Sequence, residues 1–144
     1  MWQDERALVA LSRRECLSLL RTEQVGRAVF TDRAMPQILP VTYALLGDDV
    51  VLATTSSSRL AQASHGGVLA FEVDRHDPVT RTGWSVVVTG LAVQVVEPVE
   101  QARVLSVLDP WAPGHHDLLL RLPSTVVSGR RIEADSSLSP SRIG

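Results

Sequence analysis

The stretch GWSVVVTGLAVQVV, residues 83–96, is the longest β-type segment of the chain and decides the expected fold. Its many valines are residues that favour strands. Because the segment is longer than a typical strand, we expect Gly90 to mark a bend or bulge that lets it curl around a barrel. The segment therefore predicts a curved β-sheet.

Shorter β-type runs lie on both sides of this segment, at the spacing of hairpins, and turn residues separate them. The expected strands are residues 26–31, 37–46, 50–54, 68–74, 118–122 and 125–132, and the expected helices are residues 12–22, 59–64 and 98–108. The helices do not alternate regularly with the strands, which disfavours a parallel α/β sheet. We predict a mainly β fold, a closed or partly closed barrel of about six to seven mostly antiparallel strands with a few short helices.

Two helices carry local signals. Ser12 and Glu15 match a capping box at the start of the first helix, with Cys16 facing the core. In the last helix, apolar residues at helical spacing predict a core-facing stripe made of Val99, Ala102, Leu105 and Leu108.

The second expected strand is apolar on both faces between Leu39 and Leu45. A sheet with one wet face alternates more cleanly, so we expect a barrel interior on one side and a helix or a second subunit on the other. Pro40 cannot donate to a strand ladder, which predicts an edge or a bulge there.

Length and composition limit the classes of protein. The 144 residues suit one domain, which we place at residues 1–133, with a disordered tail at 134–144. A net charge of −2 gives no basic surface for nucleic acid. We see no signal peptide and no apolar run that could cross a bilayer, and the single cysteine, Cys16, forms no internal disulfide. We expect a cytoplasmic protein that does not contact membranes.

The candidate binding residues centre on a run of Thr and Ser, residues 54–58, followed by Arg59. Such a junction between a strand and a helix offers N–H groups, hydroxyls and a guanidinium to an anion, especially a phosphate. An ordinary helix cap is the alternative. The four histidines form no metal-binding pattern, so we expect no metal site.

Two further side chains have open interpretations. Trp84 either stacks on a planar ligand or closes one end of the core. Arg27 pairs with Glu72 or Asp74 rather than with a ligand.

From about residue 11 to residue 132, the chain resembles the pyridoxamine 5′-phosphate oxidase-like flavin-binding proteins, in particular a short actinobacterial, nitroimidazole-resistance-like branch. The ordered motifs that carry the resemblance are Val25-Gly26-Arg27, residues 39–43, residues 55–60, residues 71–74, residues 83–90, Pro110-Trp111 and Gly129-Arg130-Arg131.

This resemblance implies a split β-barrel homodimer with FMN in clefts at the subunit interface. Thr55, Ser58 and Arg59 would hold the phosphate, Thr54 would also bind the cofactor, and the segment Val41-Thr42-Tyr43 would run along the flavin ring. Trp84 and Ser85, from the other subunit, would close the cleft. No catalytic side chain is assigned, which suits hydride transfer carried by the cofactor.

The chain departs from the family pattern at two points. It contains no lysine, so Arg59 serves the phosphate alone. We expect the chain to lack the C-terminal extension of pyridoxamine phosphate oxidases, so vitamin B6 oxidation is not expected. We expect an FMN-dependent oxidoreductase acting on a small molecule. The alternatives are a non-catalytic flavin-binding module and a relative that binds a deazaflavin or haem.

Overall fold

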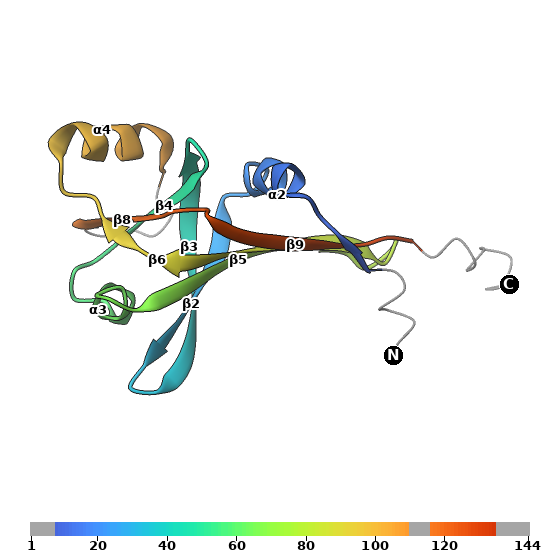
Figure 1. Cartoon of the computed structure of the whole chain (residues 1–144), viewed down its shortest axis with the longest axis horizontal. Helices are drawn as coiled ribbons and strands as arrows, with labels where there is room; N and C mark the ends of the chain where they lie inside the picture. Colours follow the sequence, from blue (N-terminus) through green and yellow to red (C-terminus); the bar gives the residue numbers. More distant parts are fainter. Residues whose placement is uncertain (1–7, 110–115, 135–144) are drawn as a thin grey trace, which may run out of the picture.

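The computed structural model describes residues 8–109 and 116–134, and its architecture is mainly β (Figure 1). Nine strands, all paired antiparallel, form one sheet in the order β1-β9-β6-β5-β2-β3-β4-β8-β7, which is not closed. The strands are β1 (Leu8–Ala10), β2 (Val25–Asp32), β3 (Met35–Leu46), β4 (Asp49–Thr54), β5 (Val68–Asp77), β6 (Thr82–Leu91), β7 (Val93–Gln94), β8 (Leu118–Leu122) and β9 (Val126–Ile132). The helices are α2 (Arg13–Leu20), α3 (Arg59–Ala63) and α4 (Pro98–Val107). The predicted fold class is confirmed. The two additional strands are the short β1 and β7.

The long segment that decided the fold is divided in two. β6 ends at Leu91, one residue past the expected bend at Gly90, and β7 begins at Val93 after Ala92. This break turns the chain from β9 and β5, the neighbours of β6, to β8, the neighbour of β7. The expected curl is therefore made by a short interruption of the strand.

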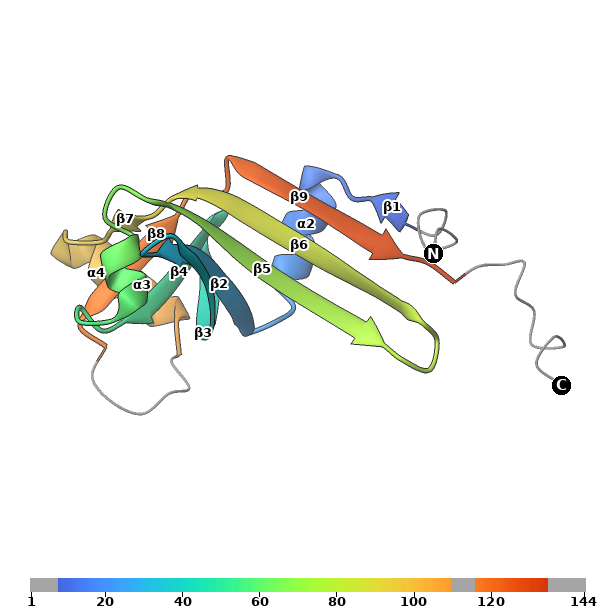
Figure 2. The same ribbon diagram turned by 90° about the horizontal axis from the view of Figure 1, so that it is seen from below.

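The β5–β6 hairpin is longer than the sequence pattern predicts. We expected a loop from Arg75 to Thr82, but the two strands stay paired to Asp77 and Thr82. The hairpin tip, residues 74–85, is called the arm below; Figure 2 shows β5 and β6 extending side by side toward it, with β9 beside β6. β9 stays paired with β6 as far as Gly83. Charged residues can continue these strands because both faces of the arm are partly exposed to solvent.

The main core lies between the sheet and α2. Ser12 caps α2, and the predicted capping box with Glu15 is present. Cys16 is fully buried, and burial raises the pKa of its thiol, as expected for a core residue. Gly129 lies so close beneath it that a Cβ there would be 2.6 Å from Cys16 Sγ. A glycine in β9 therefore lets α2 approach the sheet.

Helix α4 uses a different face from the predicted one. Its buried side chain is Val104, which packs with Leu108 against Val51 and Leu119 in a second, smaller core. Val99 and Leu105 are 62% and 57% exposed, so the expected stripe is wrong except for Leu108. Several apolar residues at helical spacing left the orientation of the helix ambiguous, and the position of β4 and β8 decides it.

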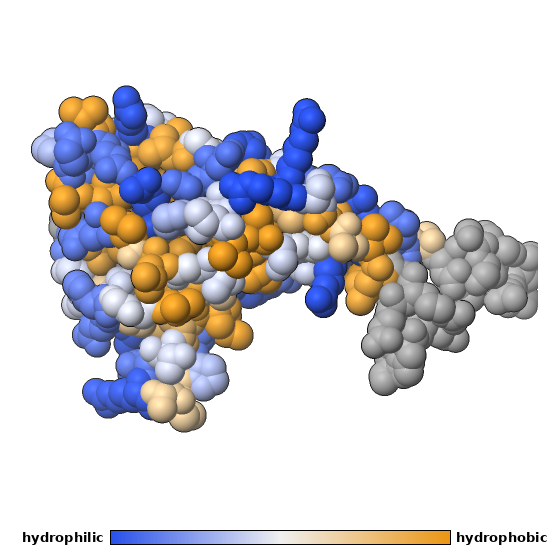
Figure 3. Space-filling model, viewed as in Figure 1, coloured by the Kyte–Doolittle hydropathy of each residue, from blue (hydrophilic) through white to orange (hydrophobic). Residues whose placement is uncertain are grey.

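One side of the five strands β3, β2, β5, β6 and β9 is open to solvent, and we call it the outer face. The strand registers place one row of side chains across it: Ile38, Val29, Ala70, Thr89 and Val126. The next row contains Pro40, Arg27, Glu72, Val87 and Ser128. Ile38 and Val126 are 65% and 61% exposed. Figure 3 shows exposed apolar side chains over the strands in the middle of the molecule and around α4.

A charged group interrupts this apolar face. Arg27 donates to both Glu72 and Asp74, at 2.8 and 3.1 Å, so both predicted pairings of Arg27 are present. Burial raises the pKa of Glu72. Hydrogen bonding to Glu72 lowers the pKa of Asp74, and Arg27 acts in the same direction. One guanidinium thus holds two carboxylates on the outer face.

None of the helices in the described residues is long and apolar enough to span a bilayer.

Candidate functional site

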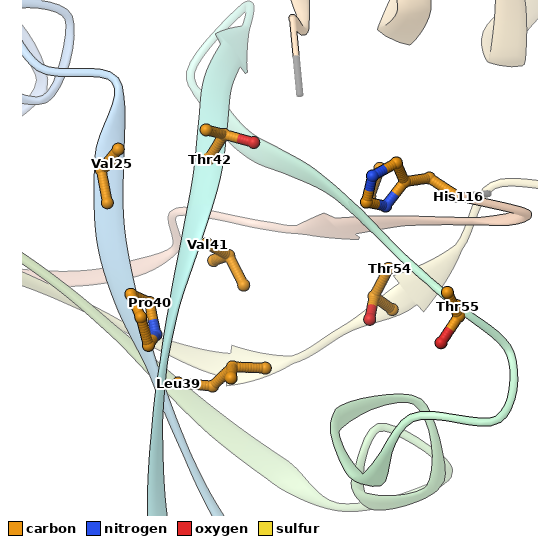
Figure 4. A pocket seen from close by; sticks show the side chains of 9 residues that line it. Val25, Leu39, Pro40, Val41, Thr42, Thr54, Thr55 and His116 are labelled. Carbon is orange, nitrogen blue, oxygen red and sulfur yellow. The ribbon is translucent and has the colours of Figure 1, made fainter. Parts of the chain in front are cut away.

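The candidate site lies where β3 and β4 separate from one another, a place that we call the fork. The two strands pair from Tyr43 and Leu52 toward their hairpin. On the other side of that pair they separate, because β3 continues along β2 while Ala53 and Thr54 of β4 pair with β8. A cavity of about 370 Å³ occupies the fork (Figure 4). It is lined by Val25, Leu39, Pro40, Val41, Thr42, Ala53, Thr54, Thr55 and His116.

Backbone groups of β3 face this cavity. The Tyr43 N–H donates to Gln24 O, at 2.9 Å, on the β2 side of the strand. Because successive residues of a strand direct their backbone groups to opposite edges, the N–H and C=O of Thr42 face the fork. Pro40 directs its C=O to the same edge and has no N–H. The predicted edge at Pro40 is confirmed. It offers the Thr42 N–H and the Pro40 C=O to the cavity, since the pairing of Tyr43 with Leu52 uses the Thr42 C=O in the β3–β4 ladder.

The turn between β4 and α3 forms the polar end of the site. Ser58 caps α3, and its Oγ accepts from the Ala61 N–H at 3.0 Å and from the Thr54 hydroxyl at 2.9 Å. Ser56 donates both its N–H and its hydroxyl to the Asp117 carboxylate, each at 2.8 Å. The turn therefore already binds one anion, which belongs to the chain itself.

Arg59 begins α3 beside this turn. Its side chain is 71% exposed, and its Nε lies 3.6 Å from the carboxylate of Asp32 at the end of β2. An exposed pair at this distance holds the guanidinium weakly. Arg59 can therefore swing toward a ligand without a large loss of stability.

The structure brings together only part of the predicted residue set. The cavity lining includes four of the predicted residues: Val41, Thr42, Thr54 and Thr55. Figure 4 shows the first two on β3 and the other two at the end of β4. The Tyr43 side chain points into the core instead, where its hydroxyl donates to Leu20 O and its ring packs edge-on against Phe71. Burial raises the pKa of Tyr43. Only the backbone of Tyr43 remains near the site.

Trp84 and Ser85 lie on the arm and do not line this cavity. Trp84 packs against the main core and borders a separate hollow of about 340 Å³ with Arg75, His76 and Asp77. Of the two interpretations of Trp84, stacking on a ligand or closing one end of the core, its contacts within one chain agree with the second. A role for either residue at the fork requires a second copy of the chain.

Sequence reasoning missed several lining residues. Val25, Leu39 and Ala53 look like ordinary strand residues, and only the separation of β3 from β4 exposes them. His116, one of the four histidines that form no metal-binding pattern in the sequence, borders the cavity opposite Val41 (Figure 4). No sequence signal identified His116, because its position depends on the pairing of β8 with β4. Within residues 8–109 and 116–134, His, Cys, Asp and Glu do not gather into a group of three that could hold a metal.

Comparisons with known proteins agree with this geometry. Residues 12–131 match the family model described as pyridoxamine 5′-phosphate oxidase. An uncharacterised protein of Mycobacterium tuberculosis, Rv0080, is 40% identical over 139 residues, which cover 93% of this chain and 91% of that protein.

Two solved structures show the same fold. The FAD binding protein from Mycobacterium smegmatis is 29% identical with a TM-score of 0.74, over 85% of this chain and 98% of that one. A protein from Bacteroides thetaiotaomicron, described as a putative 5-nitroimidazole antibiotic resistance protein, is 10% identical with a TM-score of 0.71, over 86% and 88% of the two chains. At 10% identity this second likeness concerns the fold alone.

Proposed function

The chain belongs to the pyridoxamine 5′-phosphate oxidase family, and from this premise we propose that it is a flavin-binding oxidoreductase that acts on a small molecule. The observation that carries the proposal is the fork cavity, which combines apolar walls, an open strand edge and a turn rich in hydroxyls. The flavin-binding relative from Mycobacterium smegmatis has the same fold over nearly its whole length.

The donors and acceptors of the cavity suit a flavin. Its apolar walls, Val25, Leu39 and Val41, match the faces of a planar ring. The Thr42 N–H and the Pro40 C=O can hydrogen-bond the polar edge of the ring, which carries both acceptors and a donor. Thr55 and Arg59 lie where a phosphate on the ribityl chain can reach a hydroxyl and a guanidinium. FMN, expected from the sequence, is the smallest ligand with all these parts.

A bound flavin would supply the hydride chemistry. The residues of the chain bind the ring, orient it along β3 and exclude water from one of its faces. His116 is the imidazole among the described lining residues, and its ring nitrogens can donate or accept a hydrogen bond. The remaining lining side chains are apolar or carry hydroxyls, which suits a site where the cofactor performs the chemistry.

We also propose that two copies pair through their outer faces. One row of this face is apolar apart from Thr89. Exposed apolar patches often mark surfaces that bind a partner. The cavity lies at its β3 side, and Ser85 lies toward its β9 side. A two-fold axis through the face would place the arm of one copy over the cavity of the other. Ser85, which is on the outer side of β6, would then reach the cleft as the resemblance implies, whereas Trp84 is on the core side of the same strand.

The experiment that tests the proposed function begins with purified full-length protein. A visible spectrum and mass spectrometry identify any co-purified flavin or deazaflavin, and fluorescence titration gives the Kd for FMN and for riboflavin. We expect both to bind. Turnover is then measured with reduced nicotinamides or a reduced deazaflavin and a panel of acceptors. Binding without turnover would indicate a non-catalytic flavin-binding module.

The Arg59→Ala variant tests whether Arg59 binds the phosphate of the flavin. Loss of a charge-assisted hydrogen bond should weaken FMN binding by roughly 10- to 100-fold, while riboflavin, which has no phosphate, should bind as before. Arg103→Ala, on the exposed side of α4, is the matched control and should change neither Kd. Failure of every flavin to bind would reject the proposed function.

A further inference from the structure

We infer that Arg130 of a second copy completes the fork cavity and makes it select small molecules that carry a carboxylate. The inference rests on the proposed function and on the proposed pairing of two copies, and it names the substrate class of that site. Arg130 acts here as a specificity-determining residue and takes no part in hydride transfer.

The two adjacent arginines of β9 lie on opposite sides of the sheet. Arg131 is in register with Trp84, which packs against the main core, and its guanidinium lies 3.6 Å from the Glu15 carboxylate on α2. Because successive residues of a strand point to opposite faces, Arg130 is on the outer face, in register with Ser85. Arg130 therefore belongs to the surface through which the two copies would pair.

The Arg130 side chain has no counter-ion in a single copy. It is exposed, and it forms no ion pair within the part of the chain that the structure describes. The carboxylate in the same row, Asp74, lies two strands away and already accepts from Arg27 at 3.1 Å. Because a buried charge without a partner is costly, pairing of two copies leaves a guanidinium that an anionic ligand can neutralise.

The strand order determines what Arg130 would face. The outer face runs β9-β6-β5-β2-β3, so a two-fold axis along the middle strand, β5, lays β9 of one copy over β3 of the other. The strand registers, with that of β2 and β5 continued by two residues, give one row across the face: Arg130, Ser85, Asp74, Val25 and Thr42. The axis therefore places Arg130 over Thr42 and Ser85 over Val25. Both Thr42 and Val25 line the fork cavity.

The charge that Arg130 would bring is missing from the cavity of one copy. The described lining holds apolar side chains, hydroxyls and one imidazole, but no arginine and no carboxylate. Arg59 stands apart from Thr42, at the start of α3. A guanidinium binds a carboxylate through two parallel hydrogen bonds. A flat, small carboxylic acid would therefore fit between the apolar walls of the cavity and Arg130.

The test uses the full-length protein saturated with FMN and compares, by calorimetry, the Kd of benzoate with that of benzamide, a neutral molecule of similar shape. We expect the wild type to bind benzoate at least about tenfold more tightly than benzamide. Arg130→Gln should remove this preference by weakening the binding of benzoate alone. Arg130→Lys keeps the charge and should retain part of the preference.

Arg14→Gln is the matched control because it removes another exposed arginine, from α2 on the opposite side of the sheet. It should keep the full preference for benzoate. Sedimentation equilibrium separates a ligand-binding role of Arg130 from an ion pair between the two copies. We expect Arg130→Gln to remain a dimer, and a monomeric Arg130→Gln would overturn the inference because Arg130 would then hold the copies together.

Two further results would overturn the inference. One is a wild type that binds benzoate no more tightly than benzamide, or binds neither; the other is a preference that persists in Arg130→Gln. In both cases the FMN binding measured beforehand would still support the proposed function. If FMN does not bind, the proposed function fails and the inference fails with it.

Discussion

At the scale of single residues, short side-chain contacts fix the turns that shape this protein. Asp117 anchors Ser56 below the cavity, and Asp77 closes the arm by accepting from the N–H groups of Val79 and Thr80 at 2.9 and 3.3 Å. The turn at the arm also holds Arg81 at a positive φ of 57°, which costs backbone energy for a residue with a side chain. The Asp77 contacts offset part of this cost.

The arm should therefore lose stability in acid. The N–H groups of Val79 and Thr80 hold the pKa of Asp77 below its ordinary value. A carboxyl whose folded pKa is lowered contributes stability that is present above its unfolded pKa and lost as pH falls through the folded one. We expect Asp77→Asn, which keeps an acceptor without titrating, to reduce the loss of stability between pH 5 and pH 3. Urea unfolding midpoints at pH 5 and pH 3 measure this loss of stability in the wild type and in Asp77→Asn. Equal losses in the two proteins would contradict a stabilising role of the Asp77 carboxylate.

At the scale of elements, the sequence was most reliable where one residue type has one local role. Local chemistry alone explains the capping box of α2, the edge at Pro40 and the β3–β4 hairpin turn. Gly47, in that turn, has a φ of 61°, which glycine adopts readily. The orientation of α4 does not, because Val99, Ala102, Val104 and Leu105 offer two apolar sides. Packing against β4 and β8 selects Val104 and leaves the other three exposed.

Two neighbouring substitutions on α4 test its orientation. Val104→Ala removes fully buried methyl groups from the second core, and we expect it to lower the free energy of unfolding by about 1–3 kcal/mol. Leu105→Ala removes more carbon from an exposed position and should change the free energy of unfolding by less than about 0.5 kcal/mol. Chemical denaturation of both variants gives the comparison. A larger loss for Leu105→Ala would restore the stripe predicted from the sequence.

At the scale of the whole molecule, the apolar outer face and the arm are the features that one chain leaves incomplete. The resemblance places Trp84 and Ser85 at the cofactor cleft, yet in one copy they lie on the arm and outside the cavity lining. Pairing of two copies reconciles the position of Ser85. It would also bury the Arg27, Glu72 and Asp74 group, in which one guanidinium binds both carboxylates within each copy.

Disruption of the outer face should separate the copies. Val126→Glu places a charge in the central row of the face, where Val126 is 61% exposed, so the fold should persist while the dimer dissociates. Sedimentation equilibrium is expected to give a dimer for the wild type and a monomer for this variant. Leu105→Glu, on exposed α4, is the control and should remain dimeric. A monomeric wild type would refute the proposed pairing.

The sequence predicts a domain from residue 1 to residue 133 and a tail from residue 134 to residue 144. Residues 1–7, the Pro110-Trp111 motif and residues 135–144 lie outside the described residues. The boundary at residue 133 therefore stays a prediction.

The sequence by itself determined the fold class, most strand and helix positions and the family, because these depend on periodicity, turn chemistry and the order of short motifs. It also placed Val41, Thr42, Thr54 and Thr55, which lie on two expected strands and the turn that leaves one of them. Only the tertiary structure decided which of these groups meet. The fork forms where β3 and β4 separate and pair with different strands. This separation exposes Val25 and Leu39 and brings His116 to the cavity. The Tyr43 ring points into the core instead. Strand pairing over long sequence distances is set by the packing of the whole sheet, so no local pattern could predict it.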